Sequence, residues 1–305
     1  MLSNKLKCMI LLFCLPFFTK AQSLNDGIFM PKKSFCGGIM LIQDQFKDYW
    51  EGTTKRDNAN MGTMTMQAIG VMGTYGICDK FNIVATLPYI KTKASAGPMS
   101  GWSGIQDLNL GLKYNVFKTN NLDLIAIAGG SLPLSNYVAQ HPFAIGTQSK
   151  MLYGRAMIHF LNEKGWTAMA QSTYTLRGNI KIDATNYYTD KNVNSNEVAV
   201  SDVWQVGAKA GFYSYRFELQ GTFERSKTLG GFDVRRNDVM FPAANRQEAT
   251  RVGFITSYRI KPLADVQVIV SGAYTVAGRN VGQATSWVVG LTKAVNFKKE
   301  DNAKQ

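Results

Sequence analysis

The sequence has no internal apolar run long enough to cross a membrane as a helix. Beyond residue 21, no segment of the 305-residue chain comes near an unbroken apolar stretch of about 18 residues, the shortest length that indicates a transmembrane helix. Because backbone polar groups inside a bilayer must be hydrogen-bonded within the protein, the other structure able to span it is a closed barrel. Two classes therefore stay open: a soluble protein and a membrane β-barrel.

Histidine is also scarce, which disfavours catalytic and metal-binding functions. The two histidines, His141 and His159, have no partner at a spacing typical of a metal site or a nucleophilic triad. Outer-membrane phospholipases use a serine and a histidine on the outer wall of a barrel, whereas His159 shares its predicted inward face with Tyr153 and Arg155. We therefore expect no enzyme activity, no bound metal and no cofactor.

The first residues have the pattern of a secretory signal peptide. Lys5 and Lys7 precede the apolar run Cys8–Phe18, and Thr19-Lys20-Ala21 then offers small residues at the spacing of a cleavage site. We expect residues 1–21 to be removed and residues 22–33 to form a short periplasmic arm. Among exported proteins, the composition favours a membrane β-barrel, because proline is rare (8) while glycine (28) and aromatic residues are frequent.

Positive charge is in excess, at a formal net charge of +13 that falls by three with the signal peptide. The basic residues are spread along the chain and do not form a basic helix. We therefore expect attraction to anionic lipid headgroups or anionic solutes, and no nucleic-acid partner.

The four cysteines leave two after cleavage, Cys36 and Cys78. If the first two strands form a hairpin across residues 48–59, both cysteines lie near one end of it. A disulfide is then one hypothesis, and two unpaired thiols is the alternative that we favour.

Three methionines share one face of the second predicted strand: Met64, Met66 and Met72. They indicate either a Cu(I) role or, as we favour, flexible apolar filling.

Apolar and polar residues alternate with a period of two between Trp102 and Ser135, which indicates two strands joined by a turn at 118–121. The alternation recurs in about twelve segments after Ser34. The short connections are 78–81, 118–121, 161–165, 213–216 and 261–264, and the long ones are 48–59, 93–101, 135–145, 178–196 and 229–246. Such segregation is typical of outer-membrane barrels. We predict an all-β, transmembrane, antiparallel up-and-down β-barrel of about 12 strands over residues 34–297.

Charged residues occupy the strand faces opposite the apolar ones, where a dry protein core would not tolerate them. The predicted lumen residues are Asp107, Lys113, Arg155, Lys209, Glu218, Glu224, Arg251 and Arg259. Lys209, Glu218 and Arg259 are expected at one height, and the set Arg155, Glu224 and Arg251 nearer the middle of the barrel. Two hypotheses stay open: a selectivity ring that faces a moving solute, and a structural ladder of ion pairs.

The last predicted strand ends at Phe297, which resembles the assembly signal of outer-membrane barrels, and a polar tail follows at 298–305. We therefore expect membrane lipid, the outer-membrane assembly machinery and a small solute as partners. The predicted protein is a monomer in the outer membrane of a Gram-negative-type cell.

Two neighbouring motifs resemble one known family. YGICDKFN at 75–82 with Leu87-Pro88-Tyr89, followed by GIQDL at 104–108 and LGLKY at 110–114, are similar to the MetA-pathway-of-phenol-degradation family. Its members are outer-membrane transporters distantly similar to long-chain fatty acid channels. The resemblance implies a β-barrel channel for passive passage of a small hydrophobic or aromatic solute, without catalytic residues. The alternative is a closed barrel with a surface-binding or structural role.

Overall fold

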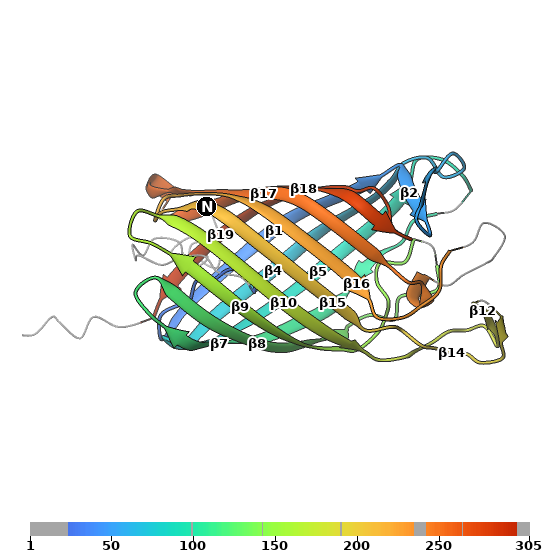
Figure 1. The fold of residues 1–305 in the computed structure, drawn as a ribbon, viewed down its shortest axis with the longest axis horizontal. Helices are drawn as coiled ribbons and strands as arrows, with labels where there is room; N and C mark the ends of the chain where they lie inside the picture. Colours follow the sequence, from blue (N-terminus) through green and yellow to red (C-terminus); the bar gives the residue numbers. More distant parts are fainter. Residues whose placement is uncertain are drawn as a thin grey trace, which may run out of the picture.

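The computed structural model describes residues 24–98, 100–141, 143–189, 191–234, 242–263 and 265–297. The expected signal peptide and the expected C-terminal tail lie outside these residues. Twelve long antiparallel strands form a closed barrel (Figure 1), which confirms the predicted fold. The barrel closes because β1 pairs with both β4 and β19, so that Ile39 lies between Val71 and Leu291.

Each barrel strand pairs with the next barrel strand along the chain. The strands are β1 (Ser34–Phe46), β4 (Met64–Cys78), β5 (Phe81–Ala94), β7 (Asp107–Lys118), β8 (Leu122–Pro133), β9 (Met151–Leu161), β10 (Trp166–Arg177), β15 (Val203–Tyr213), β16 (Phe217–Thr228), β17 (Glu248–Ile260), β18 (Val266–Arg279) and β19 (Thr285–Asn296). The short strand β6 (Ser103–Ile105) extends the pairing of β5.

The two ends of the barrel differ as the sequence predicts, with short turns at one end and long loops at the other (Figure 1). The loops contain three small antiparallel pairs: β2 (Asp48–Glu51) with β3 (Thr54–Asp57), β11 (Ile180–Lys181) with β14 (Glu197–Val198), and β12 (Tyr187–Tyr188) with β13 (Asn192–Val193). Two single-turn 3-10 helices are η1 (Pro242–Ala244) and η2 (Lys261–Leu263). In the described residues, no helix has the length and apolar character needed to cross a membrane.

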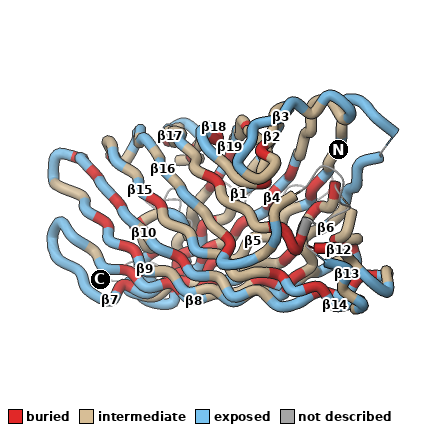
Figure 2. Tube along the Cα trace, turned by 45° about the vertical axis from the view of Figure 1, so that its right-hand side comes forward, coloured by how far each residue is buried: buried red, intermediate tan, exposed pale blue. Residues whose placement is uncertain are grey.

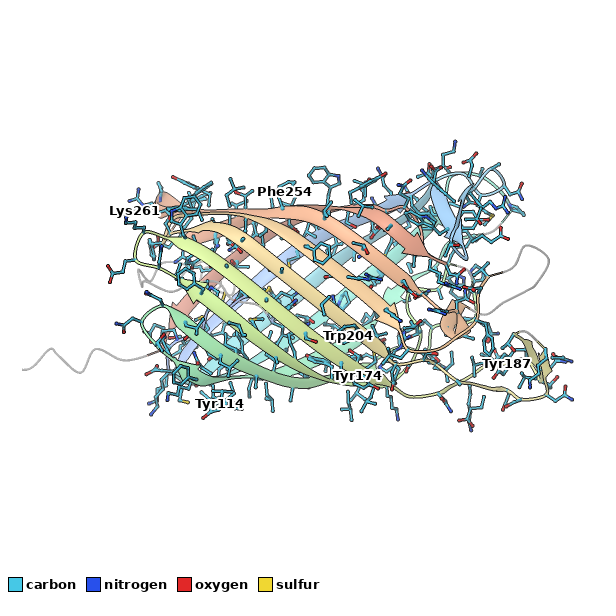
Figure 3. The ribbon with its side chains drawn as sticks, in the orientation of Figure 1. Tyr114, Tyr174, Tyr187, Trp204, Phe254 and Lys261 are labelled. Carbon is cyan, nitrogen blue, oxygen red and sulfur yellow. The ribbon has the colours of Figure 1, made fainter. Side chains whose placement is uncertain are left out.

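The strands alternate between an apolar outer face and a polar inner face, and Figure 2 shows buried and exposed residues alternating along β8–β10. On β7, the outward Leu112 and Tyr114 are 44% and 46% exposed, whereas Lys113 between them is fully buried. Figure 3 shows Tyr114 pointing outward near the short-turn end and Trp204 nearer the loop end. Aromatic residues at both ends of an apolar band are typical of barrels in a bilayer.

The long loops form an apolar core of their own at the loop end. It contains residues from three connections: Ala139, Ile180, Ile182, Val198, Val200, Ala243 and Ala244. Burial of these side chains holds the loops together, since apolar area removed from water is the main stabilising contribution in such clusters.

Candidate functional site in the barrel lumen

All eight lumen residues predicted from the sequence lie on the inner face of the barrel. On β16, for example, Glu218 and Glu224 are half-buried, and they alternate with exposed outward residues such as Leu219 and Phe223. The full set is Asp107 and Lys113 on β7, Arg155 on β9, Lys209 on β15, Glu218 and Glu224 on β16, and Arg251 and Arg259 on β17.

Residues 24–30 lie inside the barrel, and we call this segment the plug. The ammonium of Lys113 donates hydrogen bonds to the carbonyl oxygens of Asp26 (2.6 Å) and Ile28 (2.7 Å). It also lies 3.0 Å from the Asp26 carboxylate, and its side chain is only 1% exposed. The Phe29 ring is 4.8 Å from the same ammonium, close enough for a cation–π contact. The expected periplasmic arm is therefore, over these residues, part of the lumen.

Two further cations hold the plug from other strands. Arg155 Nη1 donates to the carbonyl of Leu24 (2.8 Å) and to Oδ1 of Asn25 (2.6 Å), and its Nε donates to Thr173 Oγ1 (2.7 Å). Lys209 Nζ donates to the carbonyl of Asn25 (2.7 Å). Hydrogen bonds to charged donors are about twice as strong as neutral ones. These cations thus bind a chain segment, an arrangement that neither sequence hypothesis included.

The strands between those of Lys113 and Lys209 also give the plug apolar contacts. Leu24 and Phe29 pack against a cluster on β8–β10: Ile125, Ile127, Met157 and Met169. Gly27 lies directly on the ring of His159, and a Cβ at this position would be 2.1 Å from His159 Cγ. Only glycine fits this approach without displacement. His159 itself is buried on the inner face, 3.1 Å from Thr167 Oγ1.

The neighbouring inner wall, on β15–β17, is less enclosed at several positions. Gln205, Gln220, Thr222, Glu224 and Arg251 are all half-buried, whereas Lys113, Met157 and His159 beside the plug are buried. Their side chains are on the inner face of the barrel, beside the strands that hold the plug. This wall can present both charges and amide groups to water or to a solute.

A polar network closes the short-turn end of that wall. Ser257 Oγ donates to Glu218 Oε2 (2.9 Å) and accepts from Gln267 Nε2 (2.7 Å). Arg259 Nη2 donates to Gln267 Oε1 (3.2 Å), and its guanidinium carbon lies 4.5 Å from the centre of the Tyr215 ring. Glu218 and Arg259 are therefore joined through two neutral side chains, while Lys209 is directed to the plug.

At the loop end, residues 134–141 and 143–150 fold toward the lumen. The hydroxyl of Tyr137 donates to Asp107 Oδ1 (2.7 Å) and accepts from the backbone N–H of Gln148 (2.9 Å). Burial, followed by the bond to Asp107, raises the pKa of Tyr137 above its ordinary value. Tyr137 and Ile145 pack on inner-face residues of β1, β4 and β5: Ile42, Met66, Ala68 and Ile90. Met66 is thus part of an apolar cluster.

The remaining candidate groups do not assemble into a reactive site. No disulfide joins Cys36 and Cys78 in the part of the chain that the structure describes. Cys36 is opposite Thr74, so Cys78 is four residues farther along β4, at about 13 Å for 3.3 Å per residue, beyond the ~7 Å limit for a disulfide. Over the described ranges, no three His, Cys, Asp or Glu side chains could together hold a metal ion.

These features define a class: a twelve-stranded barrel with an apolar outer wall and a charged lumen has the fold of an outer-membrane protein. Residues 71–289 match the family described as "Putative MetA-pathway of phenol degradation", and the chain belongs to this family. No curated protein matches the chain.

Solved structures of outer-membrane channels were compared with the chain. The COG4313 outer membrane channel from Pseudomonas putida F1 is 13% identical, with a TM-score of 0.70, over 90% of this chain and 100% of that chain. The Pseudomonas putida toluene transporter TodX is 8% identical, with a TM-score of 0.41, over 91% of this chain and 94% of that chain. The first likeness shows the fold.

Sequence reasoning missed the plug and the inward loop. The plug carries four apolar residues, Leu24, Ile28, Phe29 and Met30, in a segment expected to be outside the barrel. Apolar side chains with no assigned packing partner were the signal available for it. Tyr137 had no comparable signal, because its contact with Asp107 depends on how a long loop folds.

Proposed function

We propose that this protein is an outer-membrane channel for the passive passage of a small, hydrophobic or aromatic solute, without catalysis or a cofactor. Membership of the family supports this proposal, and so does the fold shared with an outer membrane channel. The observation that carries it is the asymmetry of the lumen: the plug packs on β8–β10, while five inner-face residues of β15–β17 stay half-buried, namely Gln205, Gln220, Thr222, Glu224 and Arg251.

The proposed path runs between the plug and the β15–β17 wall. Twelve strands fall between about eight, where side chains fill a barrel, and about sixteen, where an aqueous channel opens. A partly filled lumen is consistent with this intermediate size. A solute would diffuse past the fixed charges of Glu224 and Arg251, which would set its charge preference. Widening of the path requires movement of the plug, which hydrogen bonds from three side chains hold in place.

The proposal includes the route to the membrane. We propose that the signal peptide is cleaved, that the mature chain begins at Gln22, and that the assembly machinery inserts a monomer with its long loops outside. A mass of the purified protein that includes residues 1–21 would contradict the cleavage.

The channel proposal is tested by a substitution that displaces the plug without touching the strands. In Gly27→Leu, the new side chain must overlap His159, since even a Cβ would lie 2.1 Å from its ring. Gly154→Leu is the matched control, because a Cβ at Gly154 meets nothing within 4 Å. We expect Gly27→Leu to raise single-channel conductance severalfold in planar bilayers, and Gly154→Leu to conduct like the wild type.

Solute passage is measured in parallel by uptake of benzyl alcohol into liposomes that contain each variant. Faster uptake with the wild type than with empty liposomes supports the channel. If neither the wild type nor Gly27→Leu passes current or solute, the channel proposal is wrong, and the closed barrel with a binding or structural role is correct.

A further inference from the structure

The outer wall across β19, β1, β4 and β5 carries a groove of about 470 Å³. Its outward-facing lining consists of Leu41, Gln43, Gln67, Ile69, Tyr89, Lys91, Trp287 and Val289. The groove is close to the loop end, because Gln43 is three residues from the end of β1 and Lys91 three from the end of β5.

The strand register arranges these side chains in parallel rows. The first row is fully apolar, with Val289, Leu41, Ile69 and Tyr89 directly opposite one another on successive strands. The next row toward the loop end consists of Trp287, Gln43, Gln67 and Lys91, and the one after it of Thr285, Gln45, Thr65 and Lys93. A boundary between apolar and polar side chains thus crosses β1, β4 and β5, and on β19 the aromatic Trp287 stands beside it.

The glutamines in the polar rows bind one another. Gln67 Nε2 donates to Gln43 Oε1 (3.2 Å), and Gln43 Nε2 donates to Gln45 Oε1 (3.3 Å). An amide on a membrane-facing wall is unfavourable unless it is hydrogen-bonded. Two hydrogen bonds join the three glutamine amides, and the amide groups that they do not use remain able to bind a ligand with hydroxyl groups.

The two lysines beside this chain carry uncompensated charge. Among the described residues, neither Lys91 nor Lys93 has a carboxylate within the 4.0 Å that defines an ion pair. The basic residues of the nearby β2–β3 hairpin are, by contrast, paired within it, as Lys55 is with Asp48 at 2.9 Å. Two exposed ammonium groups at the level of the headgroups attract anionic lipid.

We propose that this groove binds a phosphorylated glycolipid of the outer leaflet. The phosphate would contact Lys91 and Lys93, the sugar hydroxyls would bind the amides of Gln43 and Gln67, and an acyl chain would lie on the apolar row. The glycolipid is favoured over a phospholipid because the polar rows offer a chain of amides as well as charge. The long loops, which face the outside in this class of barrel, place the groove in the outer leaflet.

The test measures lipid retained by the full-length protein in detergent, by native mass spectrometry, after incubation with one named lipid. The lipids are diphosphorylated lipid A, lipid A with both phosphates removed, and phosphatidylglycerol. The variant Lys91→Gln/Lys93→Gln removes both charges. The control Arg225→Gln/Lys227→Gln removes two positive charges from the outward face of β16 at the loop end, of which Arg225 is paired with Glu248 at 3.9 Å.

We expect the wild type and the β16 control to retain diphosphorylated lipid A at least tenfold better than Lys91→Gln/Lys93→Gln does. Removal of the phosphates should lower retention by the wild type to a similar extent. Gln43→Leu/Gln67→Leu, which keeps both lysines, should weaken retention of lipid A severalfold and leave that of phosphatidylglycerol unchanged. A heat-dependent shift in gel mobility confirms that each variant has folded as a barrel.

Three results would overturn the proposal. Equal retention of lipid A by the wild type and Lys91→Gln/Lys93→Gln would show that the lysines do not bind phosphate. Equal loss in the β16 control would show a general effect of net charge. Equal retention of phosphatidylglycerol and lipid A by the wild type would show a phospholipid site instead of a glycolipid site.

Discussion

The two inner walls of the barrel have the same alternation of faces and different environments. Both carry buried or half-buried cations, but the wall on β8–β10 adds an apolar cluster against which the plug packs. On β7 and β9, Lys113 and Arg155 bind the plug through its carbonyl groups and the side chains of Asn25 and Asp26. On β17, Arg251 is half-buried, and its Nε has no hydrogen-bond partner in the described part of the chain.

The cations that bind the plug therefore differ from those that remain accessible to a solute. A cation already bound to carbonyl oxygens cannot act on a solute unless the plug leaves first. A cation on the open wall can contact water or a solute directly. Lys113, Arg155 and Lys209 bind the plug. We therefore propose that, of the two sequence hypotheses, a ring that acts on a moving solute applies to Glu224 and Arg251.

The largest expected effect is that of Lys113→Met. The substitution removes three hydrogen bonds to the plug and leaves the Asp26 carboxylate without its ion-pair partner. Loss of one member of a buried pair costs about 3–5 kcal/mol, and we expect the lower end because Asp26 is 25% exposed. Single-channel recording should show a severalfold higher conductance, and the folded barrel should melt at a lower temperature.

Lys118→Met is the control for that experiment, because Lys118 is on the same strand but exposed at its end. It should leave both conductance and melting temperature close to the wild type. If Lys113→Met conducts like the wild type, then the two walls do not differ in the way we describe.

The features that the sequence predicted follow from the two environments of each strand. Lipid on one side and a polar lumen on the other impose a period of two, as in Leu112, Lys113 and Tyr114, so strands, faces and turns could be predicted from residue types alone. The plug could not. Most of its hydrogen bonds from Lys113, Arg155 and Lys209 are accepted by backbone carbonyls, groups that every residue carries, and only Asn25 and Asp26 add side-chain acceptors.

A smaller effect is expected from Arg251→Gln on the open wall. The substitution removes a positive charge from the proposed path without removing a contact of the plug. The ratio of cation to anion permeability should rise, measured as a shift of the reversal potential in a salt gradient, while the conductance state set by the plug is kept. A gain in conductance like that of Lys113→Met would instead place Arg251 among the residues that hold the plug.

The smallest effect is expected when the ion pair of Asp233 and Arg279, outside the lumen, is titrated with acid. This effect has to be measured before the pH dependence of conductance is used to compare the two inner walls. Asp233, in the loop after β16, accepts from Arg279 Nε (2.7 Å) and from Asn280 Nδ2 (2.8 Å). The bond from Arg279, followed by that from Asn280, lowers the pKa of Asp233. A carboxyl group with a lowered pKa stabilises the fold at a pH above its pKa in the unfolded chain, about 3.9, and loses this contribution as the pH falls through its pKa in the folded protein.

Limited proteolysis of the loops should therefore accelerate below about pH 4 in the wild type, whereas the loops of Asp233→Asn should be cleaved faster already at pH 7. Because the pair is partly exposed, the change should be modest. If conductance follows the same acid transition and Asp233→Asn abolishes it, then the loops rather than the inner walls cause the pH dependence.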